Sequence, residues 1–138
     1  MRIGAAAAAA LLAAVAFSAA GAQAPACRGA ERPREMAELI FGRRIGKDGI
    51  VSEAAWQHFL AREIMPRFAD GLTIIAASGQ WRDPATGRIS REPATLVIIA
   101  MPGNSDDRER LEAITEAYKK LFRQRSVGII VLPACVSF

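Results

Sequence analysis

Residues 71–101 read GLTIIAASGQWRDPATGRISREPATLVIIAM and contain two apolar segments joined by a short polar turn. The dipeptide Asp83-Pro84 can open this turn, and Gly87 can supply the positive backbone angle that closes it. The segments on either side are rich in isoleucine, valine and threonine, which strands favour. The pattern therefore predicts a β-hairpin with one strand over residues 71–82 and the other over residues 89–101.

The chain before this hairpin predicts one strand and one helix. Residues 36–43 alternate weakly and form the first strand, and a glycine-rich loop follows it to residue 49. Ser52 is a good N-cap for a helix over residues 53–64, whose apolar side chains recur at helical spacing. Pro66 ends this helix, because the residue before a proline avoids helical backbone angles.

The chain after the hairpin predicts a second helix and a fourth strand. Ser105 is expected to cap a helix that runs to about Arg125, with acidic residues at its start and basic residues at its end, as the helix dipole favours. Its buried stripe is expected to comprise Leu111, Ile114, Tyr118, Leu121 and Phe122. Residues 127–136 then read as a strand, and Pro133 within it requires an edge position or a break in the ladder.

The predicted order is β-α-β-β-α-β, an α+β arrangement of the ferredoxin-like kind with two helices on one face of a four-stranded antiparallel sheet. The first and third strands are then central and the other two lie at the edges, where Pro133 fits. Pro93 fits less well in a central strand, so we expect regular pairing of the third strand to start after it.

The N-terminal residues predict export. Arg2 precedes a short alanine-rich apolar run, and Ala20 and Ala22 form a small-residue cleavage site, so residues 1–22 read as a signal peptide. A retained anchor would need a longer apolar run. Residues 23–35 then form an extended lead-in, and residues 36–138 form a single domain of a periplasmic or secreted protein with no membrane span in the mature chain.

The two cysteines are interpreted in the light of export, because disulfides persist in oxidising compartments. A disulfide between Cys27 and Cys135 would close almost the whole mature chain into one loop. Lipid attachment at Cys27 is an alternative, since Ala26 is small, but Ala24 and Pro25 match such a site poorly. Two free thiols are the third possibility. A metal site is not predicted, because two distant cysteines and one histidine do not make a ligand set.

Charge and motifs exclude several function classes. The net charge is +4, with 18 basic and 14 acidic residues spread along the chain, and no basic-aromatic run of the kind that binds nucleic acid occurs. His58 is the only histidine and falls on the expected solvent face of its helix, so no histidine-based triad is possible. The segment Gly42–Asp48 lacks the spacing of a phosphate loop. We therefore predict no cofactor and no nucleic-acid partner.

The open face of the predicted sheet is the feature that bears most on function. Residues 96–101 and 127–132 are apolar at both parities, so both faces of these strands should be shielded from water. A second subunit could cover the open face as a homodimer, or a ligand cleft could form there. Alternatively, the segment around Cys27 and the C-terminal tail could cover it.

Several short motifs resemble a bacterial exported family catalogued as domain of unknown function 3574. The similar segments are FGR at 41–43, VS with Trp56, PRF.DGLT at 66–73, GQWRD at 79–83, RE at 91–92 and the terminal CVSF. The resemblance spans about the whole mature chain, although that family usually has proline where Ala69 stands here. It implies an exported single domain and supplies no mechanism.

Six polar side chains flank the second strand and its hairpin, and they could bind a small polar or anionic ligand: Arg67, Asp70, Gln80, Arg82, Asp83 and Glu92. If there is catalysis, Asp70 and Glu92 are the acid-base candidates, and Arg67 and Arg82 would stabilise charge. In a purely structural interpretation, Asp70 belongs to a turn, Trp81 lies in the core, and Arg82 and Glu92 form a cross-strand ion pair. The sequence thus favours a non-catalytic binding or interaction module of the cell envelope, with a small cofactor-free enzyme as the alternative.

Overall fold

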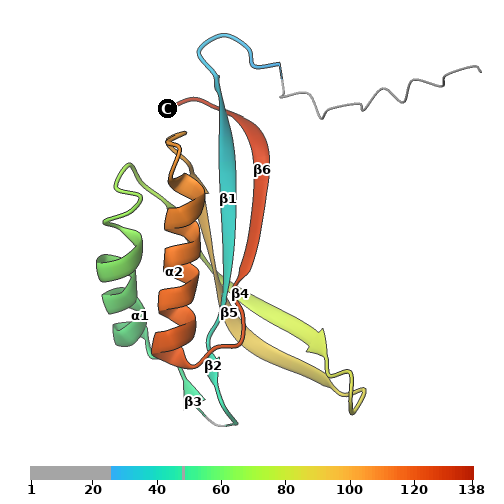
Figure 1. The fold of residues 1–138 in the computed structure, drawn as a ribbon. Helices are drawn as coiled ribbons and strands as arrows, with labels where there is room; N and C mark the ends of the chain where they lie inside the picture. The colour runs from blue at the N-terminus through green and yellow to red at the C-terminus, as the bar shows by residue number, and fades with distance from the viewer. Residues whose placement is uncertain (1–25, 48) are drawn as a thin grey trace, which may run out of the picture.

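The computed structural model describes residues 26–47 and 49–138 (Figure 1). Its elements follow the predicted order, with a short ribbon added before the first helix. They are β1 (Arg32–Gly42), β2 (Arg44–Ile45), β3 (Gly49–Ile50), α1 (Glu53–Phe59), the π-helical turn η1 (Leu60–Ile64), β4 (Thr73–Arg82), β5 (Ile89–Ala100), α2 (Asp107–Phe122) and β6 (Gly128–Val136). The predicted signal peptide lies outside the described residues. Within them, no helix is long and apolar enough to cross a membrane.

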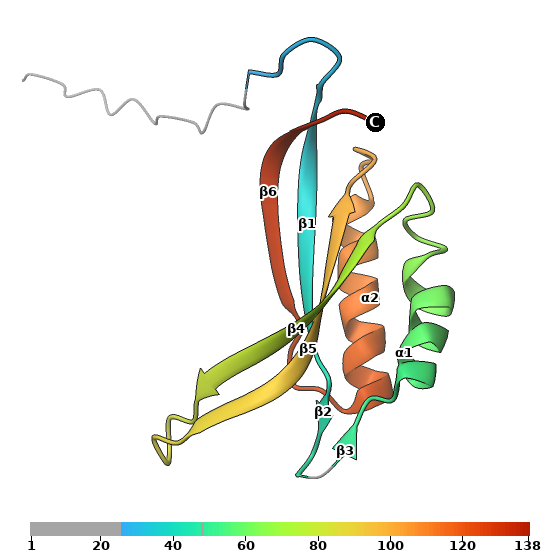
Figure 2. The ribbon, with the colours of Figure 1, turned by 180° about the vertical axis from the view of Figure 1, so that it is seen from behind.

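The four long strands form an antiparallel sheet in the order β4-β5-β1-β6. The central positions of β1 and β5 and the edge positions of β4 and β6 are those expected from the sequence. Pro133 accordingly lies in an edge strand, where its missing N–H costs no ladder hydrogen bond. Both helices lie on one side of the sheet (Figures 1 and 2). The α+β, ferredoxin-like prediction is therefore confirmed.

The core lies between this sheet and the two helices. Alternate residues of β1, Ala37, Leu39 and Phe41, are fully buried, because successive strand residues point to opposite faces. An aromatic cluster fills the space beneath the helices, with ring centroids of Phe41 and Tyr118 4.7 Å apart and those of Phe59 and Tyr118 5.0 Å apart. Burial of these rings fixes both helices on the same sheet face.

The start of α1 is as predicted. The backbone N–H of Ala55 donates to the Ser52 side chain over 3.2 Å, which satisfies one of the free donors of the first turn. The helix widens into the π-helical turn η1, which ends at Ile64, and Pro66 follows in a turn.

The predicted start and end of α2 were wrong. The helix begins at Asp107, whose Oδ2 accepts from the backbone N–H groups of Gly103 and Asn104 over 2.8 and 2.9 Å. Ser105 is therefore not the cap. The loop before the helix is instead held by its hydrogen bonds to the Asp107 carboxylate in the first turn. The helix ends at Phe122, and Arg123 adopts the left-handed conformation. Leu121 is 58% exposed, so it does not belong to the buried stripe.

β1 extends further than expected, whereas β5 covers the predicted residues and, as expected, pairs with β1 only after Pro93. β1 starts at Arg32, because residues 32–35 pair with β6 and Pro33 can face the side where β5 has already ended. β5 pairs with β4 from Ile89 onward, straight through Pro93. The Pro93 carbonyl accepts from Arg43 N over 2.9 Å, so its missing N–H faces the end of β1, where no strand residue needs that donor.

The outer part of the β4–β5 hairpin projects beyond the sheet, away from the helices (Figure 2). There the two strands pair only with each other in the four-stranded sheet, since β1 ends opposite Ala94. The turn is built as predicted: Asp83 Oδ1 accepts from Ala85 N and Thr86 N over 2.8 and 2.9 Å, and Gly87 has φ +68°. Trp81 lies on this projecting part and is 47% exposed, so its assignment to the core was wrong.

Candidate functional site

The sheet face opposite the helices, here called the open face, is apolar and exposed. The β1 residues Met36, Glu38 and Ile40 alternate with the buried ones and therefore point to this side. Four branched apolar side chains from three strands are each 40–49% exposed on it, namely Ile40, Ile75, Ile130 and Leu132. Exposed apolar patches that span several strands mark interaction surfaces or ligand grooves.

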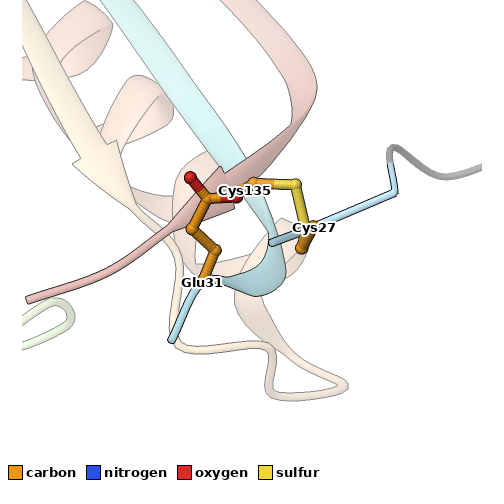
Figure 3. Close-up of side chains that lie close together, drawn as sticks. All are labelled: Cys27, Glu31 and Cys135. Carbon is orange, nitrogen blue, oxygen red and sulfur yellow. A yellow bond between two sulfur atoms is a disulfide. The ribbon is translucent and has the colours of Figure 1, made fainter. Parts of the chain in front are cut away.

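Within residues 26–47 and 49–138, which the structure describes, the N-terminal segment does not cover this face. The Cys27–Cys135 disulfide, with an S–S distance of 2.07 Å, holds that segment beside the end of β6 (Figure 3). The four apolar side chains nevertheless keep their exposure, so the third possibility raised by the sequence, cover by the chain's own ends, is not seen in the described residues. The disulfide itself is present as the sequence favoured.

One carboxylate lies in the middle of the open face. Glu38 is half-buried and is paired in register with Ile98 of β5 and Ile130 of β6, so both of its cross-strand neighbours are apolar. It belongs to none of the ion pairs formed within the described part of the chain. Arg34 and Arg32 precede Glu38 on β1 at the same parity, and they also form none of these ion pairs.

An open hollow of about 980 Å³ lies over one end of this face. Its lining combines apolar strand residues with the two arginines and Asp70, and it includes Arg32, Arg34, Met36, Ile98 and Ala100. Asp70 is the one sequence-predicted catalytic or ligand-binding candidate that lines this hollow. Sequence reasoning missed Arg32, Arg34 and Glu38, although their shared parity with Met36 and Ile40 could have placed them on one face.

The other predicted polar residues lie elsewhere. Arg67 follows η1 on the helix side and pairs with Glu63, with 2.9 Å between Nη1 and Oε2. Gln80 and Arg82 belong to the projecting hairpin, where Arg91 Nε donates to Gln80 Oε1 over 2.7 Å. These two residues are about ten positions along β4 from Asp70, which is roughly 30 Å of extended strand.

Glu92 lies opposite Gly79 in the β4–β5 ladder, while Arg82 lies opposite Ile89. The expected cross-strand ion pair between Arg82 and Glu92 is therefore not formed, because the two residues are out of register. Asp83 serves the turn: hydrogen bonds from Thr86 N and Ala85 N lower the pKa of its carboxyl group. Asp70 and Glu92, the two acid-base candidates, do not share one cleft.

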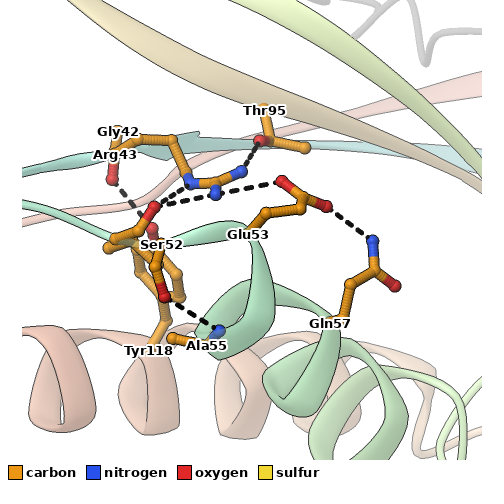
Figure 4. Close-up of polar contacts among 9 residues, drawn as sticks. Gly42, Arg43, Ser52, Glu53, Ala55, Gln57, Thr95 and Tyr118 are labelled. Carbon is orange, nitrogen blue, oxygen red and sulfur yellow. Dashed lines mark hydrogen bonds and ion pairs between the residues drawn. The ribbon is translucent and has the colours of Figure 1, made fainter.

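A separate polar cluster lies where β1 meets α1 (Figure 4). The Arg43 guanidinium donates to Val51 O over 2.8 Å, to Thr95 Oγ1 over 3.0 Å and to Glu53 Oε2 over 3.3 Å. It also lies 5.3 Å from the Trp56 ring centroid, a cation–π contact. Hydrogen bonds from Gln57 and then Arg43 lower the pKa of the Glu53 carboxyl. The hydrogen bonds of Arg43 thus join the end of β1 to the start of α1 and to β5, which indicates a structural role.

In the described part of the chain, Glu31 is the one further residue with a metal-binding side chain that lies beside the two cysteines (Figure 3). Its carboxylate, Cys27 and Cys135 have candidate ligand atoms within 4.8 Å of one another. The two sulfurs are bonded to each other, however, and a disulfide sulfur is not the thiolate that binds metals. We therefore interpret this group as a disulfide with Glu31 beside it, and not as a metal site.

Comparison with known proteins shows the family and the fold. The model of the family described as Protein of unknown function (DUF3574) matches residues 36–138, so the chain belongs to this family. No curated protein matches it in sequence. Among solved structures, a phage SAM lyase in complex with S-methyl-5'-thioadenosine is similar, with a TM-score of 0.58 and 14% identity over 83% of this chain and 95% of that one. CutA from Synechococcus elongatus PCC7942 aligns with a TM-score of 0.48 and 14% identity over 78% of this chain and 80% of that one. At such identities the likeness to the lyase shows the shared fold alone.

Proposed function

We propose that this protein is an exported, non-catalytic interaction module of the cell envelope, and that its open face packs against a second copy of the chain. The observation that carries the proposal is the exposure of Ile40, Ile75, Ile130 and Leu132 on one sheet face. Covering these side chains removes apolar surface from water, which is the main driving force of association. Sheets pack face to face through just such surfaces.

A second copy fits the shape of this surface better than a small ligand does. The apolar side chains spread over β4, β1 and β6, and the hollow at one end is open to solvent. Small-molecule sites enclose most of their ligand, whereas a two-fold interface uses the same broad patch on both subunits. A small anionic ligand between Arg32 and Arg34 would cover only the end of the face.

Export is supported by the N-terminal pattern and by the disulfide. Residues 1–22 have the composition of a signal peptide. The Cys27–Cys135 bond is of the kind that persists outside the reducing cytoplasm. These two features agree on a periplasmic or secreted location.

The enzyme alternative has weaker support. A carboxylate pair for acid-base chemistry would need to converge on one substrate. Asp70 precedes β4, and Glu92 is paired with Gly79, so roughly 30 Å of strand separates the two positions. The phage lyase shares the fold, but fold alone does not imply activity.

Two matched variants test the proposed interface. Ile130→Glu places a carboxylate in the open face, and Leu121→Glu places the same group on α2, where the leucine is already 58% exposed. Sedimentation velocity at micromolar concentration should show a dimer for the wild type and for Leu121→Glu. Ile130→Glu should sediment as a folded monomer, because an unpaired buried carboxylate is strongly unfavourable. A monomeric wild type, or equal effects of both substitutions, would argue against the interface.

A further inference from the structure

We propose that the two copies pack with Arg34 of each facing Glu38 of the other, so that this charge pair sets the register of the homodimer. The inference rests on the proposed homodimer and names the contact that orients it. It starts from Glu38, whose carboxylate lies between Ile98 and Ile130 in the apolar middle of the face. When a second sheet covers this face, the carboxylate loses water and needs a cation from the incoming surface.

The supply of cations on the open face is small. Among the described residues of β1, those that share the parity of Glu38 are Arg32, Arg34, Met36, Ile40 and Gly42. Neither arginine belongs to an ion pair within the described chain. Among the described residues, the Arg34 guanidinium lies beside Gly103 and donates one long hydrogen bond of 3.5 Å, from Nη1 to Pro33 O. Arg34 is thus free to turn toward a partner subunit.

A two-fold axis that lies between the two sheets, parallel to them and perpendicular to β1 over Met36, satisfies both groups at once. Met36 is flanked by Ala100 and Leu132, so small and apolar residues meet at such an axis. Rotation about it brings residue 34 of one copy over residue 38 of the other, since both lie two positions from Met36. Packed sheets are about 10 Å apart, a gap that an arginine and a glutamate can bridge together.

An axis over position 35 would set Glu38 against Arg32 of the other copy and Arg34 against Met36. Two further positions of the axis leave the carboxylate without a cation. An axis at Glu38 would oppose the two carboxylates to each other, and like charges in contact are repelled. An axis at Ile40 would set Glu38 against Gly42. The axis at Met36 is favoured over the one at position 35, because it sets Met36 against Met36 and not against Arg34.

Charge exchange tests this register. In sedimentation equilibrium on the oxidised chain, Arg34→Glu and Glu38→Arg should each weaken the dimer by at least about tenfold. The double variant Arg34→Glu/Glu38→Arg should recover most of this loss, because the pair is restored with its charges exchanged. Circular dichroism of each variant would report folding, and Glu38→Gln, which should also weaken the dimer, serves if Glu38→Arg does not fold.

Arg32→Glu is the matched control, because residue 32 would face Ile40 of the other copy and not Glu38. It should change the dissociation constant little and should not rescue Glu38→Arg. Two results would contradict the register and leave the homodimer intact. One is a dissociation constant that the substitutions at residues 34 and 38 do not change, and the other is recovery of the Glu38→Arg dimer by Arg32→Glu. A wild-type chain that stays monomeric removes the homodimer itself.

Discussion

Tyr118 shows how one polar side chain is accommodated in the aromatic core. Its ring is fully buried and its hydroxyl donates to Gly42 O over 2.8 Å, which joins α2 to the end of β1. Burial raises the pKa of Tyr118 to about 12, because the phenolate would lose its hydration. Nothing in the sequence around Tyr118 names Gly42 as its partner, since the two lie 76 positions apart.

Tyr118 should make stability depend on pH in the alkaline range. The unfolded chain ionises this side chain near pH 10, while the folded chain retains its proton until about pH 12. The folded state therefore binds more protons between these values, so the stability from Tyr118 is complete below pH 10 and is lost as pH rises toward 12. Tyr118→Phe should cost about 1 kcal/mol of unfolding free energy at pH 8 and less at pH 11.

Urea unfolding of wild type and variant at both pH values measures this difference. Tyr118 is the only tyrosine of the sequence, so an absorbance titration reports its ionisation directly. A difference between wild type and variant that is identical at pH 8 and pH 11 would refute the assignment.

Glu38 is the residue that sequence reasoning passed over. Its carboxylate stands in a strand predicted from 36 to 43, and a single charge in such a strand reads as ordinary solvent exposure. Its significance comes from its neighbours Ile98 and Ile130, which belong to strands far away in the sequence. Register of this kind follows from tertiary pairing and is not encoded in local pattern.

At the scale of elements, the local sequence predicted a helix cap correctly where a neighbouring side chain makes the capping hydrogen bond. Ser52 caps α1 as predicted, whereas Ser105 does not cap α2 because Asp107 accepts the preceding N–H groups. The prediction from Pro93 was partly correct, since β5 pairs with β1 only after this residue but pairs with β4 through it. A proline demotes a strand only where a neighbour needs its N–H, and the end of β1 at Gly42 removes that need. The order of the elements could be predicted from the sequence, whereas their exact boundaries depend on hydrogen bonds to other segments of the chain.

The two serines provide a paired prediction for helix capping. Ser52→Ala should lower the free energy of unfolding by about 1 kcal/mol, since the Ala55 N–H loses its acceptor. Ser105→Ala should lower it by less than about 0.5 kcal/mol, as for other surface substitutions. Chemical denaturation of both variants checks the contrast. Equal losses, or a larger loss at Ser105, would show that the capping assignment is mistaken.

At the scale of the whole molecule, the disulfide closes a loop of 108 positions between Cys27 and Cys135. It ties the start of the described chain to the last residues of β6, and β1 pairs with β6 up to Arg32 and Val136 beside it. The sequence made this bond the favoured pairing through its predicted export signal and its two cysteines. The candidate site was less accessible to prediction, since the apolar open face was foreseen and the carboxylate of Glu38 at its centre was not.

Loss of the disulfide should destabilise the protein by up to about 4 to 5 kcal/mol on the loop-entropy account. Urea unfolding with and without a reducing agent measures this for the wild type. The double variant Cys27→Ala/Cys135→Ala should match the reduced wild type and should not respond to the reductant. Unfolding at the same urea concentration in all four cases would rule out a stabilising role for this bond.

The mass of the oxidised wild-type protein in solution tests the account most directly, because every functional inference above depends on what covers the open face. Native mass spectrometry and sedimentation equilibrium over a concentration series should give twice the mass of one chain at micromolar concentration, with dissociation on dilution. A single-chain mass throughout the series would contradict the account, since Ile40, Ile75, Ile130 and Leu132 would then remain in water without a partner copy.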